Sequence, residues 1–183
     1  MMPLPNLDSS QIEGIVRGVA AYIEENRKGY SSQSVPLSGT QRLTMQHFFP
    51  TSTLDSTQLV VLADRRIANP PFYTELVKMG FEAASLPNFS EMSAITFVDT
   101  IVSHVPFTDR LLFHELVHVV QYERLGLADF AAKYVKGFLS GGSYDAIPLE
   151  INAYELDARF AAEPSRAFSV EAEVQVWIDK GMF

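Results

Sequence analysis

Residues Leu111 to Gln121 read LLFHELVHVVQ, and this stretch decides how the rest of the chain is interpreted. It contains the pattern HExxH, formed by His114, Glu115 and His118. On an α-helix, residues four positions apart differ by about 40° around the axis, so both imidazoles leave one face within reach of one ion. Glu115 lies about 100° from His114, beside the pair and poorly placed for a third ligand. A base acting on a metal-activated water belongs at that position.

The residues around this pattern are apolar on every side of the helix, which predicts a buried helix. Two histidines and a glutamate on a buried helix are costly unless something satisfies them. The chain has no cysteine, so histidine and carboxylate side chains must hold any metal, and zinc accepts both. We therefore expect zinc on His114 and His118. The alternative is a metal-free helical core in which the motif is a coincidence.

No histidine follows His118, so a third protein ligand from downstream must be a carboxylate. Glu150 and Glu155 lie on one predicted helix but about 140° apart, so only one of them faces the metal easily. We choose Glu150, because Asp157 then shares its face and can accept a hydrogen bond from a ligand imidazole. Glu155 is the alternative. The acidic residues considered are Glu123, Asp129, Asp145, Glu150, Glu155, Asp157 and Glu163.

The whole chain predicts an α+β fold, with a small amino-terminal sheet and a predominantly helical carboxy-terminal half. Its 183 residues suit one domain. Residues 1–58 are expected to form a helix and an extended polar connection, with one short strand near 43–48. Residues 94–162 are expected to supply the edge strand and both metal-ligand helices. Strands are expected at 58–63 and 94–103, and helices at 9–28, 72–79, 109–125, 128–139, 148–162 and 169–180.

Charge and hydropathy exclude several partners. Fourteen basic against 22 acidic residues give a formal net charge of -8, which repels nucleic acid and anionic lipid. No stretch approaches the roughly 20 apolar residues that a membrane span needs. The amino terminus has neither the basic region nor the apolar region of a secretory signal, so we expect a cytoplasmic protein.

Two segments carry a family resemblance. HELVHVVQ, followed about thirty residues later by Glu150-x-x-Ala153, resembles the gluzincins, the thermolysin-like superfamily of zinc metallopeptidases. More narrowly, HELVHVVQYERLG with YDAIPLEINAYELDARF is similar to small bacterial HELxHxxQ domains. The resemblance covers about residues 95–162. Thermolysin-like enzymes carry an Asp four residues after the ligand Glu, whereas this sequence has Tyr154 there.

The resemblance implies a zincin-like fold with zinc on His114, His118 and Glu150, and with Glu115 as the catalytic base. It also implies that the strand at 94–103 is the sheet edge that lines the cleft and pairs with an extended peptide.

These expectations combine into a zinc-dependent metallopeptidase acting on a peptide or protein substrate. Glu115 would take a proton from the attacking water and pass it to the leaving amine. A donor is also needed for the oxyanion. Tyr144, which follows a Gly-Gly-Ser segment, is the expected donor, with Tyr154 and His104 as alternatives. The alternative function is a catalytically idle, zinc-stabilised gluzincin-like module used in binding or assembly.

Overall fold

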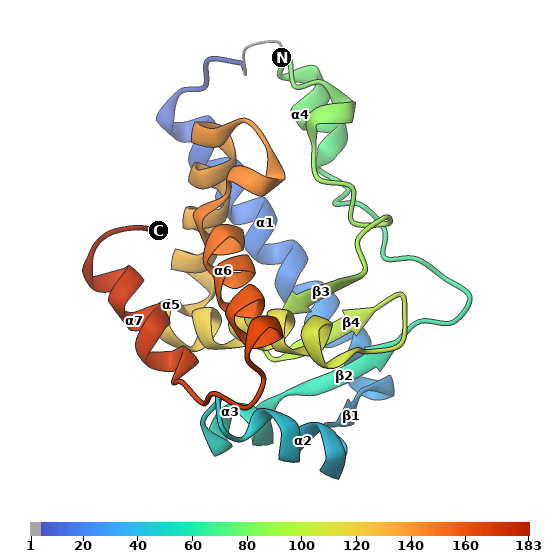
Figure 1. The fold of residues 1–183 in the computed structure, drawn as a ribbon. Helices are drawn as coiled ribbons and strands as arrows, with labels where there is room; N and C mark the ends of the chain where they lie inside the picture. The colour runs from blue at the N-terminus through green and yellow to red at the C-terminus, as the bar shows by residue number, and fades with distance from the viewer. Residues whose placement is uncertain (1–4) are drawn as a thin grey trace.

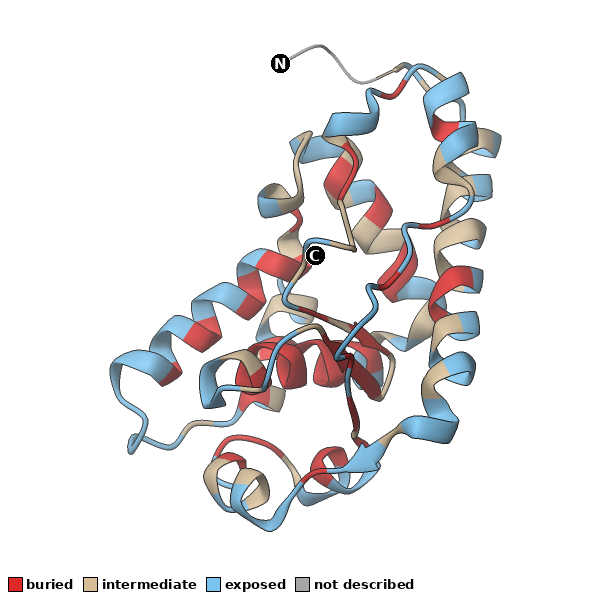
Figure 2. Ribbon diagram, turned by 90° about the vertical axis from the view of Figure 1, so that its right-hand side faces the viewer, coloured by how far each residue is buried: buried red, intermediate tan, exposed pale blue. Residues whose placement is uncertain are grey.

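A computed structural model describes residues 5–183. Its central element is α5 (Asp109–Gly141), which carries the HExxH pattern through the middle of the molecule (Figure 1). Every residue from Leu112 to Tyr122 is buried, and Figure 2 shows this half of the helix as a continuous buried segment. A helix that is apolar on all sides is stable only when other elements cover all of its faces. The other elements are arranged around α5 in this way.

A mixed four-stranded sheet packs against α5, with the strands in the order β1–β2–β4–β3. β2 and β4 are parallel, and the other two pairs are antiparallel. β4 is buried along its whole length, whereas β3 is an edge strand and packs directly on α5. The strands are β1 (Val35–Pro36), β2 (Gln58–Val61), β3 (Ala94–Phe97) and β4 (Thr100–Ser103).

Helices cover the remaining sides of α5. α6 lies along it and α7 closes one end, while α1 packs against α5 and the sheet (Figure 1). None of the helices in residues 5–183 combines the length and apolar character needed to cross a membrane. They are α1 (Ser9–Tyr30), α2 (Gly39–Met45), α3 (Thr51–Ser56), α4 (Tyr73–Lys78), α6 (Pro148–Ala162) and α7 (Val170–Asp179), with 3-10 turns at Ser31–Gln33, Ala83–Ser85 and Tyr144–Ala146.

Gly126 divides α5 into two segments that run in different directions. Its φ of 75° and ψ of 162° lie outside the helical range, in a region that only glycine enters without strain. The first segment carries the HExxH pattern, and the second runs beside α1. The two predicted helices at 109–125 and 128–139 are therefore confirmed, as is the α+β class.

The prediction for residues 31–58 was wrong in part, because this segment folds into α2 and α3 and has no strand at 43–48. Ser38 caps α2 through a capping box with Gln41, so its polar residues start a helix instead of a loop. Phe48 and Phe49 pack edge-on against Phe113 of α5, which holds the segment against the core.

The single strand expected at 94–103 was also wrong. The segment forms a hairpin, in which β3 and β4 are joined by a tight turn at Val98 and Asp99. Val98 has a φ of 62°, which β-branched residues rarely adopt. Because residues 94–103 are rich in β-branched side chains, including Val98 itself, the sequence showed no sign of a turn. The Arg27 guanidinium donates to the Asp99 carboxylate and ties this turn to α1.

Candidate metal centre

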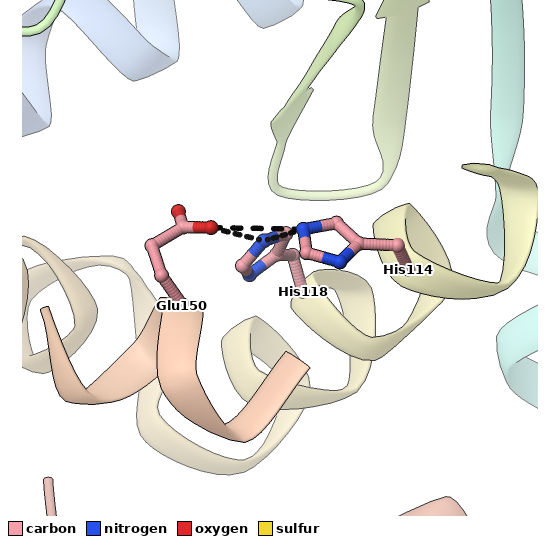
Figure 3. A group of neighbouring side chains, drawn as sticks. All are labelled: His114, His118 and Glu150. Carbon is pink, nitrogen blue, oxygen red and sulfur yellow. Dashed lines mark hydrogen bonds and ion pairs between the residues drawn. The ribbon is translucent and has the colours of Figure 1, made fainter. Parts of the chain in front are cut away.

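Three buried side chains from two helices converge beside the first segment of α5. His114 and His118 project from one face of α5, and Glu150 reaches them from the first turn of α6 (Figure 3). The two Nε2 atoms are 3.2 Å apart. Glu150 Oε2 lies 3.4 Å from Nε2 of His118 and 3.6 Å from Nε2 of His114. The structure thus brings together all three predicted ligands.

The alternative third ligand lies elsewhere. Glu155 is exposed on α6 and contributes no atom to this group. Glu123 is also exposed, and its carboxylate accepts a hydrogen bond from Thr53. The helical spacing that favoured Glu150 over Glu155 therefore predicted the right face of α6.

The arrangement of these atoms fits a bound cation. Glu150 Oε2 is buried without a hydrogen-bond partner, and buried polar atoms rarely stay unpaired. Ligand atoms about 2.0–2.1 Å from a tetrahedral ion lie roughly 3.3–3.4 Å from one another. The three measured separations lie close to that spacing. Two imidazoles and a carboxylate are also a donor set that divalent transition metals accept.

The electrostatics of the group favour positive charge. Burial lowers the pKa of His114, but the Asp157 and Glu150 carboxylates outweigh it and raise this pKa to about 10. Burial also acts against the charged form of His118, and Glu150 again raises its pKa overall. Burial alone would raise the pKa of Glu150, but the two imidazoles hold it well below its usual range. A site that stabilises protonated imidazoles beside an ionised carboxylate stabilises a metal cation by the same attraction.

Each imidazole is oriented through its other nitrogen. Nδ1 of His114 donates to Oδ2 of Asp157 at 2.9 Å, as predicted. Arg110 donates to the other oxygen of Asp157 from Nη2 at 2.7 Å and from Nε at 3.1 Å. Nδ1 of His118 donates to Oε1 of Gln121 at 2.9 Å. Because both Nδ1 atoms donate in these bonds, the Nε2 atom of each ring is the one left to bind a metal cation once the ring is neutral.

Gln121 also joins the two helices that carry the ligands. Its Nε2 donates to the Leu149 carbonyl at 3.0 Å and to Asn152 Oδ1 at 2.9 Å, both on α6. The side chain is fully buried. Sequence reasoning missed this role, although the position of Gln121 one turn after His118 was a usable signal.

The carboxylate of Glu115 lies beside the three ligands and is held from the sheet. Thr96 of β3 donates to Oε2 of Glu115 at 2.7 Å, and its hydroxyl lies 3.2 Å from the Glu115 carbonyl. Glu115 is buried. Nothing in the sequence indicated Thr96, because the contact depends on how β3 packs against α5.

The tyrosines predicted near the site occupy different positions. Tyr144 lines an open cleft together with Glu115 and His114. Burial first, and then the charge of Glu150, raise the pKa of Tyr144 well above the usual value, so its hydroxyl keeps a proton to donate. Tyr154 is exposed, and its ring centroid lies 4.6 Å from that of His114. Both tyrosines therefore border the cleft.

His104, the other candidate donor, has a structural role instead. Its Nε2 accepts from the Ile67 backbone N–H at 3.0 Å, and its Nδ1 donates to the Met92 carbonyl at 2.6 Å. Both ring nitrogens are thus engaged in joining two loops.

Comparison with protein-family models, curated proteins and solved structures found no match to this chain. The chemistry of the site is therefore the basis for assigning a function.

Proposed function

We propose that this protein is a zinc-dependent metallopeptidase with a zincin-like fold, hydrolysing peptide bonds in a peptide or protein substrate. The proposal rests above all on the convergence of buried His114, His118 and Glu150, with one glutamate oxygen unpaired, beside the carboxylate of Glu115. Two histidines and a glutamate are the protein ligands of one class of catalytic zinc site, which leaves a further position for solvent.

Zinc would be held by Nε2 of each histidine and by the Glu150 carboxylate. When bound, zinc supplies Lewis acidity, which lowers the pKa of a water molecule and polarises a carbonyl group. Asp157 and Gln121 keep both imidazoles in the tautomer that zinc requires. The fit of the donor atoms and the attraction of the site for positive charge support this assignment.

Glu115 is the general base in the proposed reaction. It accepts a proton from the attacking water and delivers it to the amide nitrogen as the C–N bond breaks, so that one water is added across the bond. The Thr96 hydroxyl holds one oxygen of the Glu115 carboxylate, which leaves the other to accept the proton. Tyr144 donates from its protonated hydroxyl to the oxyanion that develops on the carbonyl.

The edge of β3 is where an extended substrate would bind. As the last strand of the sheet, β3 has one edge without a neighbouring strand. A peptide adding to this edge would run past Thr96 and therefore past Glu115. This position supports a peptide as the substrate.

The test combines metal analysis with a peptidase assay. We expect about one zinc per chain, and cleavage of a fluorogenic peptide mixture that stops with chelator and returns with zinc. Glu115→Gln should keep zinc while kcat/KM falls roughly 10²–10⁴-fold, the usual contribution of a general base. Glu123→Gln, an exposed change on the same helix, is the matched control and should match the parent.

Two outcomes would contradict the proposal. Zinc-loaded protein that cleaves none of the peptides would favour the alternative, a zinc-stabilised binding or assembly module. A chain that neither retains zinc nor gains thermal stability from it would indicate a metal-free core.

A further inference from the structure

A second hollow adjoins the open cleft at the metal centre, because Met92, Ala94, Glu115 and Tyr144 line both. Glu115, His118 and Glu150 form one end of it. Its volume is about 80 Å³, and at roughly 10–15 Å³ for each water position it has room for about six waters. Six waters occupy roughly 180 Å³ in the liquid, which is comparable to the volume of one large apolar side chain.

Beyond the metal centre, the walls of this cavity are almost entirely apolar and aromatic. They come from α1, from the segment before and within α4, from β3 and the loop before it, and from α5 on both sides of Gly126; the second segment of α5 runs beside α1 (Figure 1). The principal wall residues are Val19, Tyr22, Phe72, Tyr73, Phe130 and Tyr134.

The polar tips of two wall tyrosines point away from the cavity. The Tyr22 hydroxyl donates to the Ala68 carbonyl at 2.6 Å, and the Tyr73 hydroxyl donates to the Pro87 carbonyl at 3.1 Å. Both hydroxyls are therefore satisfied by backbone, and the rings are left to face the cavity. These bonds also hold the loops of the wall in place, so the cavity is formed before any ligand binds.

Another apolar hollow continues this cavity along the same helices. The two share Val19, Phe72, Tyr73 and Tyr134 in their walls, and the second extends to Ile15 of α1. Ile15 is eight residues from Ile23, which lines the first cavity, and this spans about 12 Å of helix. Apolar surface therefore extends from the metal centre farther than a short side chain reaches.

We propose that this cavity binds a large apolar group of the substrate beside the bond that is hydrolysed, and that Val19 and Phe72 set its size limit. The inference rests on the proposed function and adds a substrate class to it. One end of the cavity holds the reactive groups, and the rest offers few polar partners to water, so an apolar group displaces that water favourably. An aromatic or long aliphatic side chain and a linear acyl chain share this chemistry.

Two substrate series distinguish these sources. The first is a set of quenched-fluorescent peptides with Ala, Leu or Phe at one varied position on either side of the cleaved bond. The second is a set of N-acyl amino acids with acetyl, hexanoyl or decanoyl groups. We expect kcat/KM to rise at least tenfold with apolar size in one series, which identifies the source. A change below twofold in both series overturns the proposal.

Matched variants on α1 test the wall. Val19→Phe places a ring in the cavity, whereas Val16→Phe makes the same change one turn earlier, where the side chain lines neither hollow. Val19→Phe should lower kcat/KM at least tenfold for the best large substrate and less than twofold for the smallest, with zinc content unchanged. Val16→Phe should alter kcat/KM for neither of these substrates. Phe72→Ala should shift the optimum to a larger group, and an unchanged size preference in both Val19→Phe and Phe72→Ala would contradict the assignment.

A binding measurement separates this inference from the proposed function. If no substrate is hydrolysed, amide NMR of the intact protein, with and without zinc, is recorded with N-acetylphenylalaninamide, decanamide and N-acetylalaninamide. Saturable shifts at wall residues with either large probe, lost in Val19→Phe and kept in Val16→Phe, support the cavity without peptidase activity. Their absence overturns it. Hydrolysis without size preference would sink the cavity proposal and leave the peptidase intact.

Discussion

The metal centre and the apolar cavity share an end but are built in opposite ways. Around the metal centre, the ligands and the groups that orient their rings all come from α5 and α6, and each orienting contact is a hydrogen bond. The cavity is walled by aromatic and aliphatic side chains from α1, the α4 region, β3 and both segments of α5. Helical spacing thus places the chemistry, and packing of distant segments shapes the space beside it. Variants of the metal centre should change metal binding, whereas variants of the cavity wall should change only the preference for substrate size.

The largest effect is expected at the carboxylate that completes the candidate site. Glu150→Gln removes the buried negative charge that faces both imidazoles, so zinc affinity should fall at least ~100-fold, because loss of a group that only orients a ligand already costs about 10–100-fold. Glu155→Gln changes an exposed residue on the same helix, and its zinc affinity should fall less than twofold. Competition with a chromogenic chelator measures both. Equal affinities in the two variants would show that Glu150 is not a ligand.

A smaller loss is expected one step away from the metal. Gln121→Met keeps the approximate volume but removes the acceptor for His118 Nδ1 and the bonds to α6. Zinc affinity should then fall about 10–100-fold, as for other groups that orient ligand histidines. The same chelator competition applies. Affinity at the parent value would mean that helix packing alone orients the ring.

The stabilisation by zinc should depend on pH with a definite sign. In the metal-free protein the pKa of His114 is raised to about 10 from its ordinary value. Its charged form therefore stabilises the fold fully below about pH 6.5, and this contribution is lost as pH rises through about 10. Zinc needs the neutral ring, so proton competition weakens as pH rises.

We therefore expect the increase in Tm on adding zinc to grow by several degrees between pH 6 and pH 9, measured by differential scanning fluorimetry. His118→Ala, which lacks a ligand, is the control and should show little increase at either pH. A zinc-induced shift that stays constant over this range would contradict competition at these imidazoles.

The smallest effect is expected at the junction between the two regions. Gly126→Ala places a side chain at a φ of 75°, which should destabilise the fold by about 1–2 kcal/mol. For a chain of this size that lowers Tm by roughly 2–8 °C. Gly14→Ala, at an open helical position of α1, is the control and should be neutral or stabilising. An unchanged Tm in Gly126→Ala would show that α5 tolerates a continuous helix at this point.

Several parts of the site could be predicted because they follow from helical periodicity. The positions of His114 and His118 on one face, the choice of Glu150 and the contact of Asp157 with an imidazole all depend on angles around α5 and α6. Residues 31–58 were mistaken for a connection because the serine that caps α2 resembles a loop residue. Thr96 could not be found at all, since its contact joins a strand to a helix.

By itself, the sequence determined a buried helix with two imidazoles on one face, a carboxylate on a later helix to complete a metal site, and an α+β division of the chain. These properties follow from local spacing, composition and the cost of burying polar groups. Only the tertiary structure decided that Thr96 would hold Glu115, that His104 would join two loops, and that rings from α1 and the second part of α5 would enclose an apolar cavity. Those contacts depend on how separate elements pack, because residues far apart along the chain have no fixed relation until the core is formed.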